Sequence, residues 1–400
     1  MTRRPIILVE FSPSGGLFHF AVQMGNALAA AGHQVILLTG PEPELASSQS
    51  GFEIRPVLPT WHPTNSVVRS SALRLIRRAV RAGQLVLSWL VLTWHLLRIR
   101  PRAVLWSHWR FTIEPLFVVL ISTVLQGSLL GIIAHEPLPR SDAKDTSKPK
   151  SGRLLTAAFA AAWRRMDVAF VLGPQTRDLV LRHWQPPGEV VVIPHGDERA
   201  LTNDSHQCIA VADTGPIVLF FGTWTKYKGI DVLLDAFSLV RSERPDARLV
   251  LAGGVGADIE LRHLLARAEE IGNVDARPGY VAVQKIPEIV GSARMVVTPY
   301  IRASQSGVAH LAYTFGRPVV ATDVGDLSEV VRDKETGLLV ESEDSQQLAG
   351  AILMLLDDPQ LAEQLGTAGR KLTADAWTIA AARVLEALDA VSSTPHDARP

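Results

Sequence analysis

Two loops in the second half of the chain carry residue types suited to binding phosphate. Ser306 and Gly307 stand where an apolar strand gives way to a helix, and such a helix start offers backbone N–H groups and a partial positive charge. Lys228 directly precedes Gly229 at a second strand-to-helix junction, where its ammonium group can contact phosphate oxygens. Either junction alone is also compatible with an ordinary helix start. Because both follow strands of one expected parallel sheet, they should share an edge, and together they predict a diphosphate site.

Glycine and histidine residues hold comparable places in the first half. Gly15 and Gly16 follow the first apolar strand, with His19 on the next helix, and His108 and His135 each directly follow a further strand. A Gly-Gly pair is also typical of an ordinary turn, and a lone histidine is more often structural than catalytic. His135, which ends a strand and precedes a proline-rich loop, is the strongest of these candidates.

Short apolar strands alternate with helical patterns along both halves, which predicts parallel sheets covered by helices. In the first half, strands are expected at 6–9, 34–38, 103–106, 129–134, 168–172 and 190–193. In the second half, strands are expected at 217–221, 248–252, 274–277, 295–299, 319–322 and 337–340. The fold class expected is α/β, with two doubly wound, Rossmann-like domains that face a cleft.

The length of 400 residues exceeds what one hydrophobic core usually spans, so two domains are expected. Near the middle of the chain, the alternation of apolar strands and helical segments is interrupted by polar residues. This interruption suggests a linker there. The expected division is an N-terminal domain over 1–196, a linker over 197–215, a C-terminal domain over 216–376, a last helix over 377–391 and a tail over 392–400. Residues 140–153, rich in Ser, Lys, Asp and Pro, are expected to form a surface loop.

Composition narrows the class of protein. The formal net charge is +0, so no overall field favours nucleic acid as a partner. Cys208 is the single cysteine, which rules out an internal disulfide or a cysteine metal cluster and favours a reducing compartment. The first apolar run stops at Glu10, too early for a signal peptide. A cytoplasmic globular protein is therefore expected.

Two segments raise the question of a membrane. The apolar stretch 116–134 approaches the length of a membrane span, but Gln126, Gly127 and Ser128 interrupt it, and a buried helix followed by a buried strand explains it as well. Arginines at positions 74, 77, 78 and 81 share one face of an expected helix. That pattern is typical of a helix lying on an anionic membrane, and equally of a solvated face over inward-pointing leucines. A peripheral position on the inner face of the plasma membrane is the expectation.

The second half contains a series of short segments in a characteristic order and spacing. They are Phe220-Phe221-Gly222 with Lys228-Gly229, Leu251-Ala252-Gly253-Gly254, Gly279-Tyr280-Val281, Val296-Val297-Thr298-Pro299-Tyr300, Phe315-Gly316-Arg317-Pro318 through Gly325, Glu329, and Thr336-Gly337-Leu338-Leu339-Val340. Through these segments the second half resembles the C-terminal domain of retaining GT-B glycosyltransferases of family 4. Weaker matches extend over most of the chain. They include Pro194-His195-Gly196, expected at the hinge, and Trp377, which precedes a helix expected to cross back to the first domain.

The resemblance implies a role for each matching residue. Lys228 would hold the diphosphate of a nucleotide-sugar donor, and the N–H groups of Ser306, Gly307 and Val308 would face it. The other donor-binding residues implied are Gly222, Lys226, Gly253, Gly254, Tyr280, Val281, Ser304, Gln305 and Glu329. In the first domain, Gly15, Gly16, His19 and His108 would line the acceptor site, and His135 would join Lys228 as a catalytic residue.

The sequence departs from the family at three positions. The usual glutamate pair, eight residues apart, falls on Ala303 and Leu311, and the usual arginine after the first strand of the domain falls on Thr223. A subgroup with a Ser/Thr-Gln-Ser-Gly-Val loop shares this pattern. These differences keep open a protein that binds a nucleotide sugar without transferring it.

The function expected is that of a retaining glycosyltransferase, most simply a hexosyltransferase. It would move a sugar from a nucleoside-diphosphate donor to a glycan or lipid-linked acceptor in envelope or exopolysaccharide biosynthesis. No Asp-x-Asp motif occurs, so neither a metal nor a cofactor is expected beyond the nucleotide-sugar co-substrate. A dinucleotide oxidoreductase would need a Gly-x-Gly-x-x-Gly turn, which the first loop does not supply. The donor sugar, its base, the acceptor and the oligomeric state are not specified by the sequence.

Overall fold

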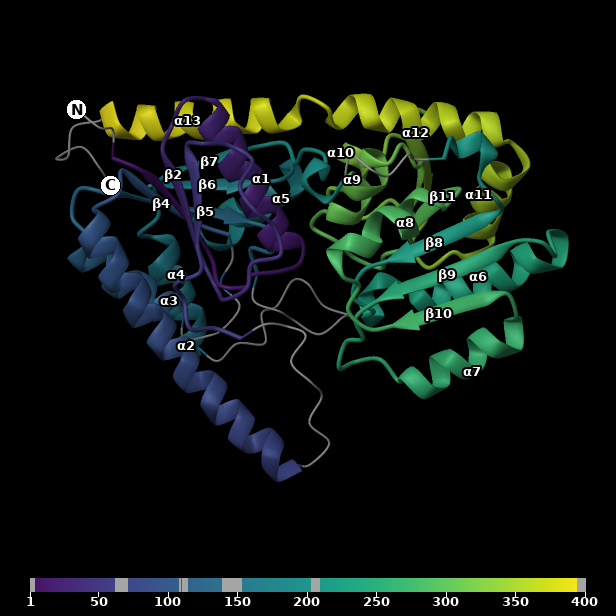
Figure 1. Cartoon of the computed structure of the whole chain (residues 1–400), viewed down its shortest axis with the longest axis horizontal. Helices are drawn as coiled ribbons and strands as arrows, with labels where there is room; N and C mark the ends of the chain where they lie inside the picture. The colour runs from purple at the N-terminus through teal and green to yellow at the C-terminus, as the bar shows by residue number, and fades with distance from the viewer. Residues whose placement is uncertain are drawn as a thin grey trace. The chain divides into compact units, whose positions relative to one another are not determined.

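The computed structural model describes residues 4–61, 71–107, 109, 114–138, 153–202 and 209–393. The chain forms two compact units (Figure 1). Unit 1 comprises residues 1–194 and 377–400, and unit 2 comprises residues 195–376. Residues 197–215, suggested as a linker by their polarity, belong to unit 2, where two short 3-10 helices, η1 (Arg199–Leu201) and η2 (Val211–Asp213), lie among the described residues.

Unit 1 is built on a seven-stranded parallel sheet in the order β3-β2-β1-β4-β5-β6-β7. The strands are β1 (Ile6–Glu10), β2 (Val35–Thr39), β3 (Phe52–Arg55), β4 (Ala103–Trp106), β5 (Leu129–Ala134), β6 (Val168–Val171) and β7 (Glu189–Val192). β3 was not expected from the sequence. The helices are α1 (Gly16–Ala30), α2 (Ser71–Ile99), α3 (Glu114–Val124), α4 (Arg153–Trp163), α5 (Pro174–His183) and, from the end of the chain, α13 (Ala376–Ser393).

Alternate residues of the unit 1 strands point to two hydrophobic cores. Ile6 and Leu8 face α1 and α13, whereas Ile7 and Val9 face the core to which α2, α3, α4 and α5 contribute. Both faces of the sheet are therefore covered, as a parallel sheet requires. The apolar stretch 116–134 contains most of α3, a turn and then β5, which agrees with the helix-and-strand interpretation.

Unit 2 contains a six-stranded parallel sheet in the order β10-β9-β8-β11-β12-β13. Its strands are β8 (Ile217–Phe221), β9 (Arg248–Gly253), β10 (Val274–Pro278), β11 (Met295–Thr298), β12 (Val319–Thr322) and β13 (Gly337–Val340), close to the expected ranges. Its other elements are η3 (Lys226–Lys228), α6 (Ile230–Glu243), α7 (Leu261–Ile271), η4 (Val283–Lys285), α8 (Ile286–Gly291), α9 (Gly307–Thr314), α10 (Leu327–Val330), α11 (Ser345–Asp357) and α12 (Pro359–Thr373).

Each sheet has one point where the strand order reverses. In unit 1 the chain goes from β1 to β2 on one side and later returns to β4 on the other. In unit 2 the corresponding break lies between β8 and β11. The loops that leave the strands at such a point diverge, which opens the crevice where parallel α/β sheets bind ligands.

Candidate functional site

The loop after β8 and the loop after β11 meet at the switch point of unit 2. Gly222 has φ +111, and a Cβ atom added there would lie 2.9 Å from Lys228 Nζ and 3.6 Å from Val308 Cγ2. The missing side chain thus leaves room for the lysine and for the first turn of α9. The half-buried Lys228 reaches over the Tyr300 ring, with Nζ 5.4 Å from its centroid. The structure therefore brings together Gly222, Lys228 and Val308, three of the residues predicted from the sequence to bind the donor.

The glycines next to this point differ from one another. A Cβ at Gly253, where φ is +149, would lie 1.9 Å from the Gly222 carbonyl oxygen, so the two backbones could not pass this closely with any other residue. A Cβ at Gly254 would meet nothing within 4 Å. Gly253 is thus required by packing of the fold, whereas Gly254 borders open space.

The start of α9 is built differently from the expectation. Ser306 occupies the N-cap position with extended backbone angles, but its side chain makes no capping hydrogen bond. Its buried hydroxyl donates instead to the Tyr300 hydroxyl, 3.3 Å away. Burial raises the pKa of Tyr300 to about 12, so its phenol stays protonated at neutral pH. Ser306 therefore ties the helix start to the strand end and leaves the first turn of α9 without a side-chain cap.

The remaining donor residues predicted from the sequence lie on neighbouring loops of unit 2. Tyr280 is 42% exposed and Val281 is half-buried, both after β10, where the Gly279 amide donates to the Gly253 carbonyl. Lys226 is exposed in η3, and its backbone amide donates to Asp258. The Ser304 carbonyl accepts from the Asp326 amide, which joins the loop before α9 to that before α10, the helix that carries the exposed Glu329.

Sequence reasoning assigned no role to one cation of unit 2 that the structure places in these loops. Arg302, half-buried in the loop after β11, has its guanidinium carbon 5.2 Å from the Tyr227 ring centroid, and that ring packs edge-on against Tyr300. The arginine therefore stands on the same pair of loops as Lys228. The sequence could have pointed to Arg302, because this arginine lies in the loop that was already singled out for leading into the start of a helix.

Two positions where the family pattern places glutamates carry apolar residues in this fold. Leu311 is 5% exposed on α9, and Ala303 packs against the main core of unit 2. Thr223, at the position of the usual arginine, is exposed. Within the ranges that the structure describes, no three His, Cys, Asp or Glu side chains gather as metal ligands.

In unit 1 the glycine-rich loop and His19 are joined by a carboxylate that the sequence did not reveal. Glu44 accepts from the Gly15 amide at 3.1 Å and lies 3.1 Å from His19 Nε2, and all three groups surround the start of α1. Gly15 is the N-cap with φ +81, and Gly16 is the first residue of α1. Glu44 follows β2 at a distance of 29 residues from Gly15, so no local pattern could have pointed to it.

Three further polar residues, Glu10, Ser107 and His135, lie at strand ends of unit 1. The Ser107 hydroxyl donates to Glu10 at 2.8 Å, which links the end of β4 to the end of β1 across the switch point, and both side chains are buried. His135, 5% exposed after β5, packs edge-on against Phe20 with ring centroids 4.5 Å apart. Phe20 in turn packs against Trp377 of α13. His108 lies outside the described residues.

Comparison with known proteins places this chain in a family. Residues 14–197 match the family described as Glycosyltransferase Family 4, and residues 215–358 match the family described as Glycosyl transferases group 1. The chain belongs to the glycosyltransferases of family 4. A D-inositol 3-phosphate glycosyltransferase of Corynebacterium diphtheriae is 32% identical over 240 residues, which are 56% of this chain and 55% of that protein. An alpha-D-kanosaminyltransferase of Streptomyces kanamyceticus is 29% identical over 231 residues, 55% of this chain and 59% of that protein.

This family-4 chain spans about half the length of the curated relatives it matches. Solved structures match it along nearly its whole length and show its fold. A sucrose-phosphate synthase from Thermosynechococcus elongatus has a TM-score of 0.73 at 22% identity and covers 97% of this chain and 99% of its own. Anabaena HepE, solved in complex with UDP-glucose, has a TM-score of 0.65 at 15% identity and covers 98% and 100%. The fold is GT-B, as the resemblance implied.

Proposed function

We propose that the chain is a retaining, metal-independent glycosyltransferase that moves a hexose from a nucleoside-diphosphate donor to a glycan or lipid-linked acceptor. The observation that carries the proposal is the convergence of Gly222, Lys228 and Val308 at the switch point of unit 2. A lysine and an uncapped helix start are together suited to a diphosphate, because one supplies a point charge and the other backbone donors. Family membership and the UDP-glucose named with HepE support a nucleotide sugar as the donor.

The proposed chemistry is a displacement on the same face as the leaving group. The bond between the anomeric carbon and the diphosphate oxygen breaks, and the diphosphate keeps the electron pair. The acceptor hydroxyl oxygen bonds to that carbon and gives its proton to a diphosphate oxygen. Lys228 and the α9 amides would stabilise the charge that grows on the leaving group, and His135 would assist at the sugar.

The donor is tested first by binding and then by turnover. A ligand that binds only the folded protein raises its melting temperature, so wild type is screened against UDP-, GDP-, ADP- and dTDP-sugars. The nucleotide sugar that stabilises the protein is then used as the donor. Its transfer to an acceptor and its slow hydrolysis are measured in the presence of EDTA. Turnover that continues in EDTA fits the proposal, whereas turnover that stops and returns with a divalent cation contradicts metal independence.

A binding protein without transferase activity is the second candidate, favoured by the apolar side chains at Ala303 and Leu311. It would bind the nucleotide sugar as tightly as an enzyme does. It would form neither a transfer product nor a hydrolysis product, and that result separates the two candidates.

We also propose that unit 1 rests on an anionic membrane, at the cytoplasmic face where envelope or exopolysaccharide acceptors are assembled. Besides the arginine pattern of the sequence, the structure shows an exposed apolar surface on α2 and α3. Ala79–Ile99 of α2 is long and apolar enough to cross a membrane, yet only 28% of its 18-residue apolar window is buried. Exposed apolar side chains form one stripe along α2 and another along the adjacent α3: Ile76, Val80, Leu87, Leu90, Trp94 and Leu97, and Leu116, Leu120 and Val124.

Basic residues accompany this apolar surface. Arg98 lies beside Trp94, with its guanidinium carbon 5.4 Å from the ring centroid, and Arg81 lies over Trp61 at 4.9 Å. Arg77 is half-buried on α2, while the side chains of Arg74 and Arg78 lie outside the described set. Apolar side chains bordered by arginine suit a helix lying in the headgroup region of an anionic bilayer.

A further inference from the structure

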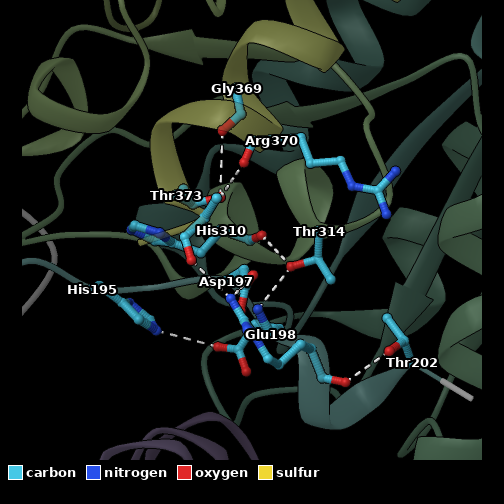
Figure 2. Close-up of polar contacts among 11 residues, drawn as sticks. His195, Asp197, Glu198, Thr202, His310, Thr314, Gly369, Arg370 and Thr373 are labelled. Atoms are coloured by element: carbon cyan, nitrogen blue, oxygen red, sulfur yellow. Dashed lines mark hydrogen bonds and ion pairs between the residues drawn. The ribbon is translucent and has the colours of Figure 1, made fainter. Parts of the chain in front are cut away.

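A buried histidine stands between two oxygen atoms at the edge of the proposed donor site. His195 Nε2 lies 3.2 Å from Glu198 Oε1, and Nδ1 lies 3.4 Å from the side-chain oxygen of Gln305 (Figure 2 shows the first contact). The His195 and Glu198 side chains are each 5% exposed. With the Gln305 amide in this orientation, each ring nitrogen of His195 faces a side-chain oxygen.

The same pair lies beside the first residue of α9. A Cβ atom added at Gly307 would lie 3.5 Å from His195 Cε1 and 4.0 Å from Glu198 Oε1, so the pair borders the space next to that glycine. Gln305 lies two residues before Gly307 in the loop that leads into the helix. The histidine therefore contacts the loop through Gln305 and lies beside the helix start, both of which are proposed to face the diphosphate.

The other end of α9 is hydrogen-bonded to Glu198. The Glu198 backbone amide donates to the Thr314 hydroxyl at 2.7 Å, and that hydroxyl donates to the His310 carbonyl at 2.8 Å (Figure 2). The His310 ring stacks on His195 with centroids 4.1 Å apart. Burial and the neighbouring His195 lower the pKa of His310 well below the usual value, so this ring is neutral and offers His195 an uncharged surface.

We propose that Glu198 and His195 are positioning residues of the proposed donor site, in which Glu198 orients the His195 ring and the ring holds Gln305 and the start of α9. This inference rests on the proposed function, since it assigns the two residues to the diphosphate end of the donor. A carboxylate that fixes an imidazole, which in turn fixes a ligand-facing group, is an established way to orient a site. Neither residue need touch the diphosphate to act.

The test compares affinity for a nucleoside diphosphate with affinity for the same nucleoside without its phosphates. Calorimetry with UDP, GDP, ADP and dTDP identifies the nucleotide that wild type binds, and the matching nucleoside is titrated in parallel. In His195→Ala, affinity for the nucleoside diphosphate should fall about tenfold, the size of effect typical of one lost hydrogen bond, while affinity for the nucleoside stays within about twofold. His263→Ala, at an exposed histidine on α7, is the matched control and is expected to behave as wild type.

A conservative pair of variants completes the experiment. Glu198→Gln keeps a hydrogen-bond acceptor without the charge. It should therefore lose less affinity for the nucleoside diphosphate than Glu198→Ala does. A purely structural role for Glu198 does not require this difference. Equal losses for nucleoside and nucleoside diphosphate, or wild-type binding in both His195→Ala and Glu198→Ala, would overturn the inference and leave the proposed function standing. If His195→Ala does not fold, the Glu198→Gln comparison decides. If wild type binds none of the four nucleotides, the proposed function fails, and the inference fails with it.

Discussion

Lys228 Nζ lies 5.4 Å from the centre of the Tyr300 ring, so a cation from the loop after β8 rests on an aromatic side chain from the loop after β11. The ring restrains the lysine where the two loops diverge, and an ammonium group at this distance is weakly attracted to the ring face. The lysine is thus placed before any ligand arrives, and little ordering remains to be done on binding.

The first prediction concerns this lysine. Lys228→Ala should weaken binding of the nucleoside-diphosphate donor by about 10- to 100-fold, because a charge-assisted contact to phosphate is lost. The melting temperature without ligand should change little, since the side chain is only half-buried. Calorimetry on Lys228→Ala and on Lys371→Ala, an exposed lysine of α12, checks the prediction. Equal affinities in the two variants would remove Lys228 from the site.

Two adjacent glycines make opposite predictions. Gly253→Ala should destabilise unit 2 by about 3 kcal/mol or more, because its Cβ would collide with the Gly222 carbonyl and its backbone angle disfavours a side chain. Gly254→Ala should cost under about 1 kcal/mol, because its Cβ would enter open space. Urea unfolding of the two variants measures both values. Similar stabilities would show that the close approach at Gly253 does not constrain the fold.

Much of this arrangement followed from the sequence because strand, loop and helix obey local rules. The residues of β8 and β11 are apolar runs that end at Gly222 and Pro299, and the switch point follows from the order of strands in a doubly wound sheet. The partners of these loops were harder to predict. Glu44 and His195 are joined to the sites by tertiary contacts over 25 or more residues, and His195 was expected only at the hinge, just before the suggested linker.

Other differences have a similar physical cause. Ser306 is a favourable N-cap residue by type, yet the nearby Tyr300 hydroxyl competes for its side chain, and this competition depends on folding. The outward-facing apolar stripe of α2 was also missed, because periodicity shows that a helix has an apolar face without showing what covers it.

The histidine of unit 1 yields a prediction about turnover. His135→Gln should lower kcat for sugar transfer on the order of 100-fold if the ring assists at the reacting sugar, and it should leave affinity for the nucleoside diphosphate unchanged. The matched control is His183→Gln, at an exposed position on α5. Steady-state kinetics combined with nucleotide binding tests the separation. A kcat equal to that of the control would assign His135 to packing against Phe20 alone.

The buried His310 predicts a dependence of stability on pH. Its pKa is lowered in the folded protein by burial and by His195, so the unfolded chain binds a proton more readily, and stability rises with pH over this range. The loss of folding stability that comes from keeping His310 unprotonated is absent at pH 8. It grows as the pH falls below about 6.5, the usual pKa of an unfolded histidine, until the lowered pKa of the folded state is reached. His310→Gln should therefore lose less stability than wild type between pH 7.5 and 5.5, a difference of up to about 1.4 kcal/mol per pH unit.

The comparison requires urea unfolding at both pH values. Parallel losses of stability in wild type and His310→Gln would show that protonation of His310 makes no contribution. His263→Gln, at an exposed site, should follow wild type throughout.

The apolar surface of α2 predicts membrane binding. The double variant Leu90→Ser/Trp94→Ser removes two side chains that are each 54% exposed, so folding should be unaffected while binding to vesicles of phosphatidylglycerol and phosphatidylcholine should fall at least about tenfold. Leu239→Ser/Met354→Ser, at exposed apolar residues of unit 2, is the control. Equal sedimentation of both variants with the vesicles would contradict a membrane-binding surface on α2. If wild type binds vesicles of pure phosphatidylcholine as strongly as vesicles that contain phosphatidylglycerol, the lipid charge contributes nothing to binding.

The last helix of the chain supplies Trp377, Ala380, Val384 and Leu388 to a core of unit 1, although most of that unit precedes residue 195. During synthesis on the ribosome, the segment forming unit 2 emerges whole while the first unit still lacks one wall of its interior. We therefore expect unit 2 to complete its fold before unit 1, which reverses the usual order in which the N-terminal domain folds first. Until α13 has been synthesised, the surface that it covers leaves Phe20 and its neighbours exposed, and a chain truncated before Ala376 would keep that apolar surface exposed.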